Sequence, residues 1–142
     1  MAQLIYSGTG FELKVDLKII QDTIKEQAYL EENASRLWLK NNDPSMLWYS
    51  KYYLLRGKVT KLELAYLTLL KSGSGKPDSG TKRMVFLYFN KIRELNTELL
   101  EMDSDGVERS FISEQDYIES ANELKNRMAN LNQLRELISG DN

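Results

Sequence analysis

Apolar residues recur at steps of three and four along most of this chain, which is the period of an amphipathic helix. The clearest run is Trp48, Tyr52, Leu55, Val59, Leu62, Tyr66 and Leu69. Similar runs pass through 85–102 and 117–138, and a looser one through 17–40. Together with their flanking residues, these runs predict four helices, at 17–40, 44–71, 82–102 and 114–138. Their near-heptad spacing and short connections predict an all-α fold, an antiparallel four-helix bundle with long helices.

The first sixteen residues follow a different period. Phe11, Leu13, Val15 and Leu17 alternate with charged residues, which is typical of a half-buried strand. Two glycines separate this run from a shorter apolar run before it. The pattern predicts a β-hairpin or extended arm over 1–16, and it predicts that this arm precedes the helices.

Polar residues mark where the helices begin and end. Asp43 before Pro44 predicts an N-cap, and Ser113 with Asp116 predicts a start of the capping-box type. The acidic stretch 103–106 predicts the end of the third helix, and 107–112 is then compatible with a short strand. The Gly- and Ser-rich stretch 72–81 predicts a flexible loop. Nothing in the sequence explains why the second helix has a glycine, Gly57, in its interior.

The composition limits the chemistry. The length of 142 residues predicts a single helical domain, 1–142. The chain has no cysteine and no histidine, so disulfides, Cys/His zinc sites and the commonest general base are excluded. The stretch 75–82 departs from the phosphate-loop pattern, and 101–106 resembles half a calcium loop but position 112 is Ile. We therefore predict a protein that is not an enzyme and takes no cofactor or metal.

The apolar segments also bear on location. No basic stretch followed by an apolar run, as in a signal peptide, is visible, and no apolar run reaches the roughly 18 residues of a membrane span. We predict a cytoplasmic protein that does not enter a membrane.

Charge is sorted along the chain. Residues 1–35 hold three Lys against six acids, net −3, and 36–93 hold twelve basic residues against three acids, net +9. Residues 94–142 hold four basic residues against twelve acids, net −8. Such asymmetry bears on partners and internal docking. Either the basic middle faces an acidic partner, or the acidic C-terminal helix folds back over it; the near-cancelling charges favour the second.

Aromatic residues that lie off the apolar runs are candidates for contacts with a partner protein. They are Tyr49, Tyr53, Phe86 and Phe89. Basic residues between them are the alternative candidates, for nucleic-acid binding. They are Lys51, Arg56, Lys58, Lys61, Lys76, Lys82 and Arg83. The sequence pI of about 5.3 counts against a dedicated nucleic-acid binder.

These patterns predict a non-enzymatic helical interaction or assembly protein that acts through protein–protein contacts. Its partner is another protein or a second copy of itself, with a dimer as the simplest oligomer. Small helical proteins of this composition are frequent among phage and bacterial accessory factors. A nucleic-acid-binding accessory protein that uses the region 36–93 is the alternative.

Overall fold

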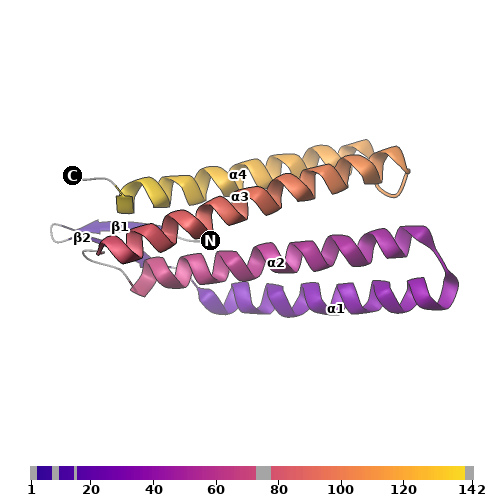
Figure 1. Ribbon diagram of the computed structural model, residues 1–142, viewed down its shortest axis with the longest axis horizontal. Helices are drawn as coiled ribbons and strands as arrows, with labels where there is room; N and C mark the ends of the chain where they lie inside the picture. Colours follow the sequence, from indigo (N-terminus) through magenta and orange to yellow (C-terminus); the bar gives the residue numbers. More distant parts are fainter. Residues whose placement is uncertain (1–2, 8–9, 15, 73–77, 140–142) are drawn as a thin grey trace.

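The computed structural model describes residues 3–7, 10–14, 16–72 and 78–139. Its four long helices are α1 (Leu17–Asn41), α2 (Pro44–Ser72), α3 (Ser79–Glu108) and α4 (Glu114–Ser139). Consecutive helices run in opposite directions (Figure 1). The all-α class and the four helices are thus confirmed, and three of the helices begin and end within one residue of the predicted bounds.

Two short strands precede the helices. They are β1 (Gln3–Ser7) and β2 (Gly10–Lys14), paired antiparallel with Ser7 opposite Gly10. A two-stranded hairpin is marginal in water unless side chains pack it against another element. Because the side chains of 1–15 lie outside the described part, a stable hairpin stays a prediction.

Two predicted helix starts are present with their capping hydrogen bonds. The amide of Ser45 donates to Oδ1 of Asp43 at 3.0 Å, ahead of a helix that begins at Pro44. At the start of α4, the amide of Asp116 donates to Oγ of Ser113 at 3.0 Å, and the amide of Ser113 donates back to Asp116 at 3.3 Å. Each bond joins residues two or three apart, which is why the sequence alone predicted them.

The predicted end of the third helix is wrong. The stretch 101–106 is helical, α3 continues to Glu108, and 107–112 forms no strand. Asp103 is buried and accepts a hydrogen bond from Ser120 of α4, so contacts with other helices hold the acidic stretch in α3. The chain turns after Glu108, where Ser110 has a φ of 63° and the amide of Phe111 donates to the carbonyl of Gly106 at 2.8 Å.

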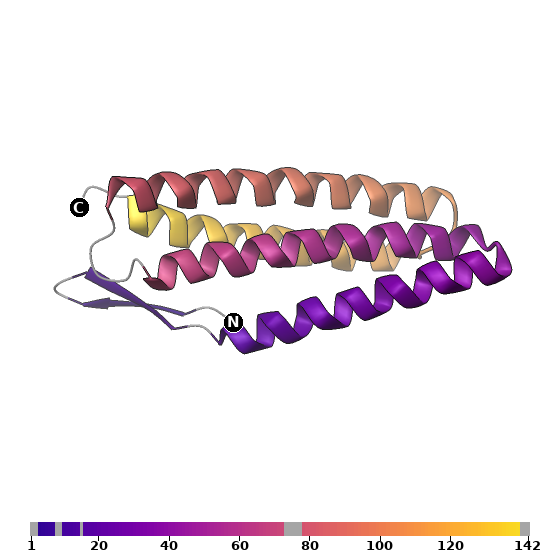
Figure 2. The ribbon, with the colours of Figure 1, turned by 60° about the horizontal axis from the view of Figure 1, so that its bottom comes forward.

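The hydrophobic core comes from three of the four helices. Its buried side chains, among them Tyr66, Ile92 and Leu124, belong to α2, α3 and α4. Helix α1 packs along α2 (Figure 2), and its buried residues are Gln27 and Ala34. Ala34 is buried there, and the hydroxyls of Ser35 and Ser50 share a hydrogen bond of 2.5 Å. Only Leu17 and Ile20, at the start of α1, reach the core.

Gly57 of α2 has open space around it. A β-carbon built at this position meets no atom within 4 Å outside its own helix. Gly57→Ala is therefore expected to raise the free energy of unfolding by about 0.5–1 kcal/mol, because alanine loses less backbone entropy in a helix. Urea denaturation followed by circular dichroism measures this, and a less stable variant would show that the position needs glycine.

Candidate interaction surface

The structure separates the four aromatic candidates into two groups. Tyr49 and Tyr53 are half-buried near the start of α2, with ring centroids 6.1 Å apart, and the Tyr49 hydroxyl donates to the carbonyl of Phe111 at 3.3 Å. Phe86 and Phe89 lie in the N-terminal half of α3. No single surface therefore contains all four residues.

Phe89 is not available to a partner in the way the sequence suggested. Its side chain is only 6% exposed and belongs to the core, whereas Phe86 is 50% exposed. The expectation that both rings face solvent was wrong for Phe89, because α3 packs against both α2 and α4 and its buried stripe is wider than one apolar run. The guanidinium of Arg135 lies 5.0 Å from the Phe89 ring centroid and 5.9 Å from that of Phe86.

The basic candidates also divide. Lys51, Lys58, Lys61 and Arg83 are exposed, and Lys82 is half-buried. Lys76 lies outside the described residues. Arg56 does not face solvent as a nucleic-acid contact requires, because its side chain is 15% exposed and Nη2 lies 3.2 Å from Oε1 of Glu123.

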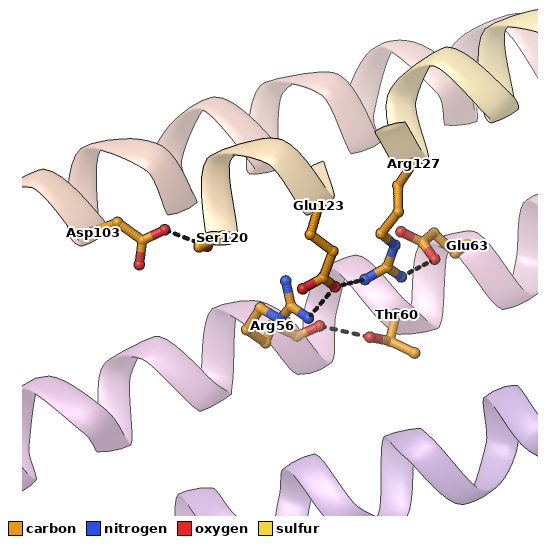
Figure 3. Close-up of polar contacts among 7 residues, drawn as sticks. All are labelled: Arg56, Thr60, Glu63, Asp103, Ser120, Glu123 and Arg127. Atoms are coloured by element: carbon orange, nitrogen blue, oxygen red, sulfur yellow. Dashed lines mark hydrogen bonds and ion pairs between the residues drawn. The ribbon is translucent and has the colours of Figure 1, made fainter. Parts of the chain in front are cut away.

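Arg56 belongs to a network of alternating charges between α2 and α4 (Figure 3). Glu123 accepts from Arg56 at 3.2 Å and from Arg127 at 3.3 Å, and Arg127 also pairs with Glu63 of α2. Each helix supplies one acid and one base. The acidic C-terminal helix thus covers one cation of the basic middle, and the expected docking of the two segments holds for Arg56 but not for the exposed lysines.

Two carboxyl groups, one in this network and one near it, have raised pKa values. Burial raises the pKa of Glu63, and the adjacent charge of Arg127 opposes the rise. Burial also raises the pKa of Asp103, against the hydrogen bond from Ser120, 2.7 Å long. Both groups are held between helices, and neither lines the groove between α2 and α3. Their contacts fix the position of α4 on α2 and α3.

The exposed lysines of α2 point away from α4. Lys58 is two residues from Arg56, and Lys61 is two residues from Glu63. At 3.6 residues per turn, two residues are about 200° around the helix. The same argument places Glu101 and Asp105 of α3 on the side away from the contact of Asp103 with α4. These lysines and acids therefore share the face of the α2–α3 pair that α4 does not cover.

A groove of about 850 Å³ runs along this face, and we call it the α2–α3 groove. Its floor is apolar and consists of Leu55, Leu62, Leu95 and Met102. A smaller cavity of about 330 Å³ shares Met102 and Asp105 with it and extends it to Trp38 of α1. Helix α4 lies behind the α2–α3 pair in Figure 2, and all the residues that line the groove belong to α2 and α3.

The two edges of the α2–α3 groove carry opposite charges. The α2 edge carries Lys58 and Lys61, which form no ion pair with any described residue. The α3 edge carries acids at three positions, Glu98, Glu101 and Asp105. A third lysine of the groove, Lys91 on α3, is paired with Glu94 at 3.3 Å.

Exposed leucines extend both edges. Leu54 is 52% exposed and lies four residues before Lys58, on the same face of α2. Leu87 is 50% exposed and lies four residues before Lys91 on α3. Large apolar side chains that border a charged groove are typical of a protein interaction site.

Sequence reasoning found the lysines of this surface but missed its acids and leucines. The boundary drawn at Arg93 between the basic and acidic segments falls inside α3, so one helix carries both signs of charge. The seven-residue spacings of Glu98 with Asp105 and of Leu95 with Met102 were the available signal, since residues seven apart share a helix face.

Comparison with known proteins gives no further guide: no protein-family model, curated protein or solved structure matches the chain. In the ranges that the structure describes, no helix has the length and apolarity needed to cross a membrane. Nor do three or more acidic side chains gather there in an arrangement that suits a metal ion.

Proposed function

We propose that this protein is a non-enzymatic interaction or assembly protein, which binds a helix of a protein partner in the α2–α3 groove. The observation that carries the proposal is the open groove itself, with an apolar floor, oppositely charged edges and exposed leucines on both sides. An amphipathic helix buries its apolar face in a groove of this kind, and flanking charges set its orientation. The proposal also assumes the cytoplasmic location predicted from the sequence.

A role in nucleic-acid binding has less support on this surface. The lysines at 58 and 61 share the groove with three carboxylates on α3, which would repel a phosphate backbone. Arg56 is engaged with Glu123, so one predicted phosphate contact is already used. The region 36–93 therefore supports a protein partner better than a nucleic acid.

A role in catalysis also has little support. The buried carboxyls of Glu63 and Asp103 have raised pKa values, which is common at active sites. Each, however, is engaged with a side chain of α4 between the helices, outside the α2–α3 groove. Ion pairs and hydrogen bonds that hold helices together perturb acidities in the same way.

The proposal predicts where the protein can be cross-linked. With the photoreactive residue p-benzoylphenylalanine in place of Leu54, irradiation of cells that produce the protein should give protein adducts that resist nuclease. The matched control is the same residue in place of Ile118 of α4, which is 45% exposed against 52% for Leu54 but lies on another helix. It should give few adducts.

Three outcomes would contradict the proposal. Adducts that disappear with nuclease would instead support the nucleic-acid alternative. Equal adduct patterns at Leu54 and Ile118, or none at either, would show that the groove has no special role.

A further inference from the structure

The charges on the α2–α3 groove limit what can lie on it. Two lysines stand on the α2 edge, and on the α3 edge three carboxylates outnumber one lysine, Lys91, which is paired with Glu94. An occupant must therefore present acids toward α2 and bases toward α3. The α2–α3 face of this same chain presents both, because it has acids on one edge and bases on the other.

We propose that the occupant of the groove is a second copy of this chain, related to the first by a two-fold axis that runs along the groove parallel to the helices. This inference rests on the proposed function and names its partner. Two-fold dimers are the commonest closed assemblies, and each patch in them must be complementary to itself. The α2–α3 face satisfies this condition in charge and in apolar character.

The direction of the axis follows from the positions of the charges. A rotation about an axis along the groove lays α2 of one copy over α3 of the other, and it keeps each residue at its own level along the helix. Lys58 and Glu98 line the same groove, and Lys51 and Asp105 line the adjoining cavity. Lys58 of each copy then meets Glu98 of the other, and Lys51 meets Asp105, which also pairs with Arg109 of its own chain at 3.2 Å.

An axis perpendicular to the helices gives the wrong contacts. It would lay α2 on α2 and set the lysine edges of the two copies against each other. The axis along the groove leaves one approach of like charges, between Lys61 and Lys91. The ion pair of Lys91 with Glu94 offsets that repulsion.

The same arrangement covers the apolar residues at the edges. Leu54 on α2 and Leu87 on α3 are half exposed in the single chain. With α2 laid over α3 of the second copy, both leucines come to lie between helices, as does the floor of the groove. Removing these side chains from water supplies the main driving force for association, and the charges select the orientation.

Charge reversal in the full-length protein tests the arrangement. Sedimentation equilibrium of the wild-type chain at 1–100 µM, chosen as roughly the range of weak to moderate dimers, should show a dimer. Lys58→Glu alone and Glu98→Lys alone should each raise the dimer dissociation constant by at least about tenfold, because each sets like charges together twice in a two-fold dimer. Lys125→Glu, at an exposed position on α4, is the matched control and should leave it unchanged.

Mixing the two weakened variants gives the sharpest result. A heterodimer of the Lys58→Glu chain with the Glu98→Lys chain has an opposite-charge contact at both positions, so the mixture should associate about as tightly as wild type. An effect on folding within one chain cannot be repaired by mixing, and far-UV circular dichroism of each variant checks that it is folded.

Three results would overturn the second copy as occupant. The first is a wild-type chain that is monomeric at 100 µM, which is roughly the weak end of specific association. The second is a dimer whose dissociation constant does not change in the single charge reversals. The third is a mixture of the two variants that stays monomeric. If the chain is monomeric but still gives nuclease-resistant adducts with another protein at Leu54, the proposed function stands and only the dimer is excluded. If the chain is monomeric and gives no such adducts, both the dimer and the proposed function are excluded.

Discussion

Replacing Arg127 by methionine is expected to lower the free energy of unfolding by about 3 kcal/mol near pH 7, at the lower end of the range for breaking a buried ion pair. Arg127 pairs with Glu63, whose side chain is 10% exposed. Methionine keeps most of the apolar stem but removes the charge, so Glu63 is left buried with no cation in contact. The lower end of the range applies because the Arg127 side chain is itself 29% exposed.

The loss should depend on pH. Burial raises the pKa of Glu63 above its ordinary value of 4.5, although the charge of Arg127 opposes this. In the variant that opposition is gone, so the pKa rises further. A raised carboxyl pKa means that the folded state holds its proton more tightly than the unfolded chain. The stabilisation of the folded state by the proton on Glu63 is therefore full below pH 4.5, the ordinary pKa of this carboxyl. It is lost as the pH rises through the pKa that Glu63 has in the folded protein.

Urea denaturation near pH 5 and pH 7 measures both effects. The deficit of Arg127→Met relative to wild type should be smaller near pH 5. Adding Glu63→Gln should recover much of the loss near pH 7 and flatten the dependence on pH. Arg109→Met is the matched surface control, since its ion pair with Asp105 is exposed, and it should cost less than about 1 kcal/mol. An equal deficit at both pH values would contradict this account of Glu63.

Gly106→Ala is expected to destabilise the protein by about 1–3 kcal/mol, the usual range for an overpacked interior. A β-carbon at Gly106 would lie 2.7 Å from Cζ2 of Trp48 and 3.2 Å from Cγ1 of Ile112. Trp48 is 5% exposed, and its indole N–H donates to the carbonyl of Met102 at 3.1 Å. The ring cannot move aside without stretching this bond.

Gly57→Ala is the natural control, because it has the same change in helix propensity without the contact. If Gly57→Ala raises the free energy of unfolding and Gly106→Ala lowers it, the difference between the two changes gives the cost of the clash with Trp48. Near-ultraviolet circular dichroism should also change for Gly106→Ala, since Trp48 lies against the new methyl group. If Gly106→Ala proved as stable as wild type, the close approach of Trp48 to α3 would be wrong. In a double-mutant cycle, Trp48→Leu should remove most of the penalty.

Features set by neighbours in the sequence could be predicted from the sequence alone. The helical period, the N-cap of Asp43 and the capping box of Ser113 with Asp116 depend on residues within about one turn of one another. Three of the four helices were accordingly bounded to within one residue. Lys58 and Lys61 of the α2–α3 groove were named because they lie among aromatic residues in the basic segment 36–93.

The side of each helix that is covered was decided only by the tertiary structure. Phe86 and Phe89 are three residues apart on α3, yet one is half exposed and the other is core, because α3 packs against both α2 and α4. The third helix passes its predicted stop because Asp103 meets Ser120 of α4 and Gly106 admits Trp48 of α2. Arg56 is held in an ion pair between helices by Glu123, 67 residues away.

The candidate site shows the same division. The sequence determined that the segment 36–93 is basic and that the segment 94–142 is acidic. Only the packing of α2 against α3 brought the two edges together around an open apolar floor. The local period of the sequence specifies which side chains share one face of a helix. Which other helix covers that face depends on contacts between residues far apart in the chain, and no local pattern encodes these contacts.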